Sequence, residues 1–409
     1  MRKPSPSRRS AAAGRTLAAA TLVVAGLLPL AVAPAHASAP PVGVRAAADG
    51  DDHDFPSGGL SPELRAKLDQ AVQQVLQEAG IPGAQVGIWL PGKGSYIRAF
   101  GVADKATGAP MTDNLNMRIG SETKTFTATA VLELVDDGLV GLDDPISKYI
   151  DGVPNGDCIK LRDLLDMRSG LFSYSADDDF VHALLSDPNH VFTPQELLAY
   201  GYKHDNVFEP GTQFQYSNSN YILLGLVIEK MTGRSVRDVI HQRVTEPSHL
   251  ERTIFPVGPE LPRPYAHGYT NQTLSGQIED STHWNPSWAW SAGAMISDLH
   301  DLKHWAKDLA TGTLLSPATQ AERLNVLPTG IPGAGYGLGI FNIQGWIGHN
   351  GSLPGYESLT IYLPEEHATV VALLNTDVFY QGNEPSTVLG KAITSIITPN
   401  HIYDIPVEK

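Results

Sequence analysis

The chain has 409 residues, with 44 Asp and Glu against 29 Lys and Arg, and it contains one cysteine, Cys158. This length allows a full hydrophobic core, and a net charge of −15 argues against a nucleic-acid-binding surface, which needs clustered basic residues. A single cysteine excludes an internal disulfide framework and a cysteine-rich zinc or iron–sulfur site. The composition predicts a globular protein whose partners are small molecules or cell-wall fragments.

The N-terminus has the pattern of a secretory signal peptide. A basic segment that ends at Arg15 precedes the apolar stretch Leu17–Val32, and Ala35-His36-Ala37 supplies small residues for cleavage. We expect removal of residues 1–37, which takes away five basic and no acidic residues and lowers the net charge from −15 to −20. Residues 38–59, rich in Ala, Pro, Gly and Asp, are then expected to form a flexible leader.

An uncleaved membrane anchor is the alternative interpretation of the same segment. Pro29 interrupts the apolar run and Pro34 follows it, so cleavage is favoured. Arg8-Arg9 leaves a twin-arginine export route open. We therefore expect a secreted, extracellular monomer that has no stable membrane association after signal removal.

The first ordered elements predicted are a helix and a hairpin. The helix runs from Ser61, a good N-cap, to Glu78, with apolar residues at helical spacing until Gly80. Strands at 84–90 and 96–102 follow, joined by a turn rich in Pro and Gly.

The middle of the chain is predicted to be mainly helical, and the end returns to strands. The expected helices are 123–136, 161–167, 194–201 and 219–232; the expected strands are 336–343, 345–348, 358–363 and 369–374, followed by a helix near 384–397. We therefore predict one catalytic unit of α/β (α+β) class, in which residues 60–116 and 291–409 form an antiparallel sheet flanked by helices. Residues 117–290 form a mainly helical inserted region.

The strongest local pattern for chemistry is Ser121-Glu122-Thr123-Lys124 at the start of a predicted helix. At a spacing of i, i+3, the Lys124 amine can reach the Ser121 hydroxyl. A lysine that acts as a base must be neutral for part of the cycle, which burial favours. Alone, the pattern is also that of a helix cap followed by a surface lysine.

Two later stretches offer partners for this pair. The Tyr216 phenol can carry a proton between nucleophile and leaving group, and Asn218 has a donor and an acceptor for a substrate amide. In Gly348-His349-Asn350-Gly351-Ser352, His349 can donate into the site, and the Ser352 N–H together with that of Ser121 can form an oxyanion hole. Taken singly, the first stretch is an ordinary helix cap and His349 a structural histidine.

The order of these three stretches resembles that of the penicillin-recognising serine hydrolases, in their class C β-lactamase-like branch. The likeness runs from Leu60 to the C-terminal helix and is nearest to the secreted D-alanyl-D-alanine carboxypeptidases of actinomycetes. It implies the β-lactamase/DD-peptidase fold, an acyl-enzyme on Ser121, and Lys124 and Tyr216 as the proton-handling pair. It also implies substrate-binding roles for Asn218, Trp288, His349, Asn350, Gly351 and Ser352, with Trp288 at the rim of the site.

Two positions depart from the relatives that bind a terminal carboxylate. By this resemblance, those relatives have an Arg directly after the Gly-Leu-Gly strand and a Thr inside the His-x-Gly stretch. This chain has Phe341 in place of the Arg and Asn350 in place of the Thr. No basic residue lies between Gly339 and His349. A bidentate carboxylate clamp from this strand is therefore not expected.

The sequence gives little support to other kinds of site. It has no Gly-x-Ser-x-Gly elbow and no His-Glu-x-x-His stretch, so we expect no metal and no cofactor. Cys158 is expected to be a small buried or half-buried residue.

The leading functional prediction is a serine-type D-Ala-D-Ala carboxypeptidase acting on cell-wall peptides. The alternatives are a class C-like β-lactamase, an esterase or a D-amino-acid amidase, and a β-lactam or cell-wall binding protein without turnover. The expected partner is a small peptide, ester or β-lactam substrate, with no nucleic acid.

Overall fold

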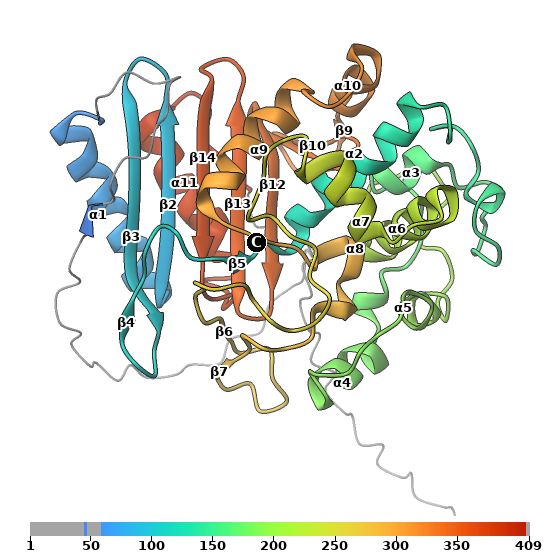
Figure 1. Ribbon diagram of the computed structural model, residues 1–409, viewed down its shortest axis with the longest axis horizontal. Helices are drawn as coiled ribbons and strands as arrows, with labels where there is room; N and C mark the ends of the chain where they lie inside the picture. Colours follow the sequence, from blue (N-terminus) through green and yellow to red (C-terminus); the bar gives the residue numbers. More distant parts are fainter. Residues whose placement is uncertain (1–44, 47–58, 406–409) are drawn as a thin grey trace, which may run out of the picture.

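The computed structural model describes residues 45–46 and 59–405 (Figure 1). The predicted signal peptide, residues 1–37, and most of the predicted leader lie outside the described residues. Arg45–Ala46 (β1) pairs with β3 at one edge of the central sheet.

The sheet has ten strands, nine of them in the order β1-β3-β2-β14-β13-β12-β11-β10-β9, while β4 pairs with β3. Every pairing in it is antiparallel. Because β14 lies between β2 and β13, the N-terminal hairpin joins the C-terminal strands in one sheet (Figure 1). The strands are β2 (Gly83–Leu90), β3 (Gly94–Asp104), β4 (Ala109–Pro110), β9 (Leu327–Pro328), β10 (Ala334–Tyr336), β11 (Phe341–Ile343), β12 (Trp346–Leu353), β13 (Tyr356–Leu363) and β14 (Ala368–Leu374).

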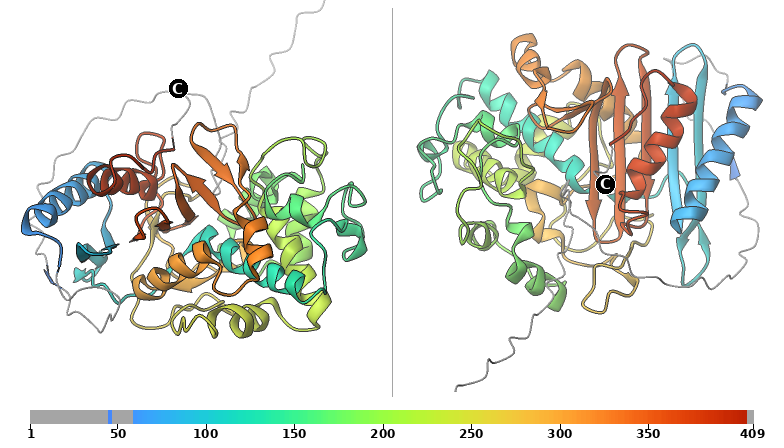
Figure 2. Two further views of the ribbon diagram at one scale, coloured as in Figure 1. Left: turned by 90° about the horizontal axis from the view of Figure 1, so that it is seen from above. Right: turned by 180° about the vertical axis from the view of Figure 1, so that it is seen from behind.

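Two helices from opposite ends of the chain cover one face of the sheet (Figure 2). The first is α1 (Pro62–Ala79), which begins where the Ser61 side chain accepts from the Leu64 N–H and ends at Gly80 in the left-handed conformation. It packs against α11 (Pro385–Ile397), which also contacts β13 and β14. This layer buries the face of the sheet that is remote from the helical region.

The opposite face is covered by α9 (Leu299–Thr311), which packs on β2, β12, β13 and β14. The helical region lies beside it and is centred on α2 and α6, which pack on each other (Figure 1). In the described part of the chain, no helix is both long and apolar enough to cross a membrane. The helices are α2 (Thr123–Asp136), α3 (Leu161–Leu165), α4 (Asp178–Ser186), α5 (Pro194–Gly201), α6 (Asn218–Thr232), α7 (Val236–Ile240), α8 (Trp290–Gly293) and α10 (Pro317–Leu324).

The antiparallel sheet with flanking helices confirms the predicted fold class. One predicted strand is wrong: 336–343 is two short strands, β10 and β11, which pair with each other. The turn between them contains Gly339 at φ +79°, where an added Cβ would lie 2.4 Å from the Ala128 Cβ, so the chain reverses against α2. Cys158 is exposed, because it lies in a surface turn, and its predicted burial is also wrong.

Candidate active site

Ser121 lies in the 3-10 turn Gly120–Glu122, which leads directly into α2. One helical turn further on, the Lys124 Nζ lies 3.0 Å from the Ser121 Oγ and 2.7 Å from the carbonyl oxygen of Ala292 in α8. The predicted i, i+3 contact is therefore present. Ala292 is a partner that the sequence did not indicate.

The Lys124 amine is wholly buried, and its two hydrogen-bond partners are a hydroxyl and a carbonyl. The Tyr216 and Tyr221 rings lie 4.9 and 5.6 Å from Nζ. Burial without a carboxylate partner lowers the pKa of Lys124 well below its usual range. A neutral amine can donate to Ala292 and offer its lone pair to the Ser121 hydroxyl, which is the arrangement of a general base.

Tyr216 lies two residues before α6, and its ring is 4.9 Å from the Lys124 Nζ. Burial raises the pKa of its phenol well above 10, and this effect outweighs the opposing one of the contact with Ser121. Its hydroxyl makes no hydrogen bond of normal geometry within residues 59–405. The phenol is therefore protonated, next to the nucleophile, and available to a substrate atom.

Asn218 begins α6 and is almost fully buried. Its backbone N–H donates to the Ser173 Oγ at 3.0 Å, and its Nδ2 donates to the Ser175 Oγ at 2.9 Å. These bonds from the segment around Tyr174 fix the amide two residues from Tyr216.

The strand β12 supplies the opposite wall of the site. Its pairing with β11 ends at Gly348, opposite Phe341, so within the described chain no strand pairs with the outer edge of residues 349–353. An added Cβ on Gly120 would lie 2.6 Å from the Ser352 nitrogen, and one on Gly351 would lie 1.9 Å from the Ile119 carbonyl oxygen. The two glycines thus let β12 approach the turn that carries Ser121, with the Ser352 backbone nitrogen against Gly120.

The His349 imidazole is buried and has partners at both ring nitrogens. Nδ1 donates to the Asn350 carbonyl oxygen, because a carbonyl can only accept, so Nε2 accepts from the Tyr336 hydroxyl at 3.2 Å. Burial lowers the pKa of His349 to about 3, and the ring is neutral. The expectation that His349 donates into the site therefore differs from the structure, in which it supports β12.

Asn350 and Trp288 also have partners that the sequence did not reveal. The Asn350 Nδ2 donates to the Glu384 Oε2 at 2.5 Å, from the residue just before α11. Trp288 is buried, its carbonyl oxygen accepts from the Tyr174 hydroxyl, and its ring lies 6.2 Å from that of Phe180. These contacts place Trp288 in an aromatic cluster rather than in an exposed rim.

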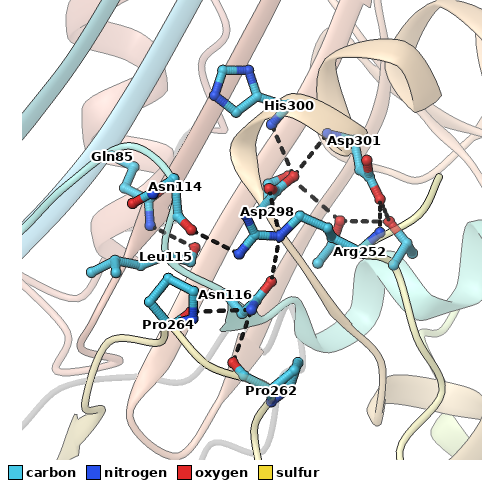
Figure 3. A network of polar contacts seen from close by, with 12 residues as sticks. Gln85, Asn114, Leu115, Asn116, Arg252, Pro262, Pro264, Asp298, His300 and Asp301 are labelled. Carbon is cyan, nitrogen blue, oxygen red and sulfur yellow. Dashed lines mark hydrogen bonds and ion pairs between the residues drawn. The ribbon is translucent and has the colours of Figure 1, made fainter. Parts of the chain in front are cut away.

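A polar network holds the segment that precedes the nucleophile (Figure 3). The Arg252 guanidinium lies 3.1 Å from the Asp298 carboxylate and donates to the Asn114 carbonyl oxygen at 2.8 Å and to the Asn116 Oδ1 at 3.3 Å. Asp298 also caps α9 by accepting from the His300 and Asp301 N–H groups. The network therefore ties residues 114–116 to the start of α9.

Comparison with known proteins identifies the family. The Beta-lactamase family model matches residues 68–389. The chain belongs to the beta-lactamase family. The antiparallel sheet with flanking helices agrees with this membership.

This beta-lactamase family member is similar to several characterised chains. It is 29% identical over 334 residues to Protein flp of Staphylococcus aureus (strain NCTC 8325 / PS 47), a match that covers 78% of this chain and 65% of that protein. A D-stereospecific amidohydrolase from Streptomyces sp. is 29% identical, with a TM-score of 0.73 over 82% of this chain and 99% of the other. The D-amino acid amidase from Ochrobactrum anthropi SV3, complexed with D-phenylalanine, is 27% identical, with a TM-score of 0.72 over 81% and 99%.

Proposed function

We propose that this chain is a D-stereospecific amidohydrolase that cleaves the amide bond after a D-amino acid through an acyl-enzyme on Ser121. The observation that carries the proposal is the 3.0 Å contact between the buried Lys124 Nζ and the Ser121 Oγ. The names of the Streptomyces and Ochrobactrum relatives support a D-amino-acid substrate. Among the predicted alternatives, this choice favours the amidase over the carboxypeptidase.

Acylation follows from the positions of these groups. Lys124 takes the Ser121 proton, and Oγ attacks the amide carbon while the Ser121 and Ser352 N–H groups stabilise the oxyanion. The C–N bond then breaks as the proton passes from Lys124 through the Tyr216 hydroxyl to the leaving nitrogen. The products of this step are the free amine and an ester between the acyl group and Ser121.

Deacylation uses the same residues in the reverse sense. Water loses a proton toward Tyr216 and Lys124, and its oxygen attacks the ester carbon. The Ser121 Oγ leaves and recovers that proton, which releases the carboxylic acid. Each turnover consumes one water and restores the enzyme.

The test combines labelling with turnover. A fluorophosphonate probe is expected to label the wild type and the surface variant Ser275→Ala but not Ser121→Ala, and D-phenylalanine amide is expected to be hydrolysed faster than its L-enantiomer. Equal labelling of wild type and Ser121→Ala would remove Ser121 as the nucleophile. Equal rates on the two enantiomers would contradict D-stereospecificity.

A wider substrate panel separates the remaining alternatives. A D-Ala-D-Ala peptide, a chromogenic cephalosporin and a short-chain nitrophenyl ester would be compared with D-phenylalanine amide under the same conditions. We expect the amide to have the highest kcat/KM. Stable labelling without release of any product would instead favour the binding protein without turnover.

A further inference from the structure

The C-terminal strands of the sheet carry carboxyl groups but no basic side chain. From residue 324 to residue 390 the sequence contains no Lys or Arg, and this stretch supplies β9 to β14. It does contain five acidic residues, Glu357, Glu365, Glu366, Asp377 and Glu384. On the side of the site formed by β12, these strands therefore supply no Lys or Arg side chain that could attract an anionic group.

Glu384 is the acidic residue that touches the site wall. Its carboxylate accepts from the Nδ2 of Asn350, which lies between His349 and Gly351 on the part of β12 whose outer edge has no partner strand. Burial is the main cause of the raised pKa of Tyr216, and the charge of Glu384 adds to it in the same direction. A substrate that lies along this edge is therefore within the field of the Glu384 carboxylate.

The basic residues nearest in the sequence or the site do not cancel this field. Burial disfavours the charged form of Lys124 and lowers its pKa well below the usual range. Lys391, on the helix that follows Glu384, pairs with Asp404 at 2.8 Å. Arg323, the last basic residue before the stretch, is buried against α2 and donates to the Thr129 hydroxyl.

We infer that Glu384, held by Asn350, is a specificity-determining residue that makes the site reject leaving groups with a free carboxylate and accept uncharged amides. The inference rests on the proposed function, whose acyl-enzyme mechanism it leaves unchanged. A substrate carboxylate on the β12 edge would meet a like charge, whereas a carboxamide would meet the Asn350 amide and the Glu384 oxygens as hydrogen-bond partners. The substrate class is therefore D-amino-acid amides and peptides with an amidated end.

The test uses two peptides that differ only in the leaving group, an acylated D-Ala-D-Ala with a free carboxylate and the same peptide as its C-terminal amide. The measured quantity is the ratio of their kcat/KM values. We expect wild type to prefer the amide and Glu384→Gln to lower that preference by about tenfold or more, since like-charge repulsion is lost. Glu366→Gln, which removes the same charge from an exposed turn, is expected to leave the ratio unchanged.

A pH series on wild type gives a second readout that needs no variant. Burial raises the pKa of Glu384 to about 7, so the amide preference should grow as the pH rises through about 7 and weaken below it. The other ionisable groups around Glu384 are Glu357 on β13, Glu122, Tyr403 and Tyr216; burial raises the pKa of each. The ratio cancels titrations that affect both substrates equally, and it should be flat with pH in Glu384→Gln.

The outcomes separate this inference from the proposed function. If wild type cleaves neither peptide nor D-phenylalanine amide, the proposed function is wrong. If it cleaves the amide but Glu384→Gln keeps the wild-type ratio, or Glu366→Gln shifts it equally, only the role of Glu384 is overturned. Should Glu384→Gln fail to fold, a ratio in wild type that does not change with pH overturns that role by itself.

Discussion

The site and the network of Figure 3 surround a basic side chain in different ways. In the network, Arg252 has a carboxylate partner, Asp298, at 3.1 Å, and Asp298 in turn caps a helix. In the site, Lys124 is wholly buried without a carboxylate partner among its hydrogen bonds, and the Tyr216 hydroxyl beside it makes no normal hydrogen bond to the described residues. Lys124 therefore differs from Arg252 in having no carboxylate to hold its proton, which suits a group that must give that proton up.

This contrast predicts opposite consequences for stability and rate. Removing the uncompensated amine should cost activity and relieve a burial penalty. Breaking the compensated pair should cost stability and leave the chemistry intact. Lys124→Met, Tyr216→Phe and Asp298→Asn test this in order of decreasing effect on rate, and His349→Ala is described with the first of them as its comparison.

Lys124→Met is expected to lower kcat/KM by at least about a thousandfold, because the general base is lost. The same change is expected to raise the free energy of unfolding at neutral pH by about 1–3 kcal/mol, since a buried amine becomes a buried apolar group. The folded state depresses the pKa of Lys124, so wild-type stability should rise with pH and the advantage of the variant should shrink toward pH ~10. Amide turnover and urea unfolding at several pH values measure both effects.

His349→Ala is the comparison for that variant. His349 is neutral and hydrogen-bonded on both sides, so its loss should reduce the rate by only about tenfold. A larger rate loss in His349→Ala than in Lys124→Met would show that the two roles are misassigned.

Tyr216→Phe is expected to lower kcat/KM by about a hundredfold, because the ring stays in place but the hydroxyl that carries the proton is gone. The free energy of unfolding should change little or rise, since the hydroxyl has no normal hydrogen bond to lose within residues 59–405. A marked loss of stability would mean that the hydroxyl has a structural partner. Steady-state kinetics and thermal unfolding of the same preparation distinguish these cases.

Asp298→Asn is expected to keep kcat/KM within about twofold of wild type and to lower the free energy of unfolding by about 1–3 kcal/mol, because the buried Asp298 loses its ion pair with the half-buried Arg252. Urea unfolding, with activity measured per folded molecule, tests it. A rate loss as large as that of Tyr216→Phe would show that the network takes part in catalysis.

The sequence predicts what local patterns determine. The Ser61 cap and Gly80 stop define α1 to within a residue, and the i, i+3 spacing of Ser121 and Lys124 becomes a real contact. The reversal between β10 and β11 was missed because it depends on α2 and on the backbone of Arg323, against which Gly337 packs. Such a contact between distant segments leaves no periodic signal in the chain.

Glu384 shows the same limit at the site. It lies 34 residues from Asn350 in the sequence and precedes a proline at the start of a helix, where an acidic residue is common for electrostatic reasons alone. The one available signal is the absence of Lys and Arg from residues 324–390. It points to the site only once the sheet is known to place those strands beside Ser121. The Ala292 carbonyl was equally hidden, because a backbone oxygen carries no residue-specific signature.

The close approach of Gly120 and Gly351 has a consequence for the order in which the protein becomes active during synthesis. The ribosome makes Ser121 and Lys124 in the first third of the chain, whereas β12, β13 and β14 emerge near its end. An unfinished chain that stops before Gly351 holds Ser121 and Lys124 but lacks Ser352, whose N–H is the second donor of the proposed oxyanion hole. Under the proposed mechanism, acyl transfer therefore begins only after nearly the whole polypeptide has been made and its last strands have inserted beside β2.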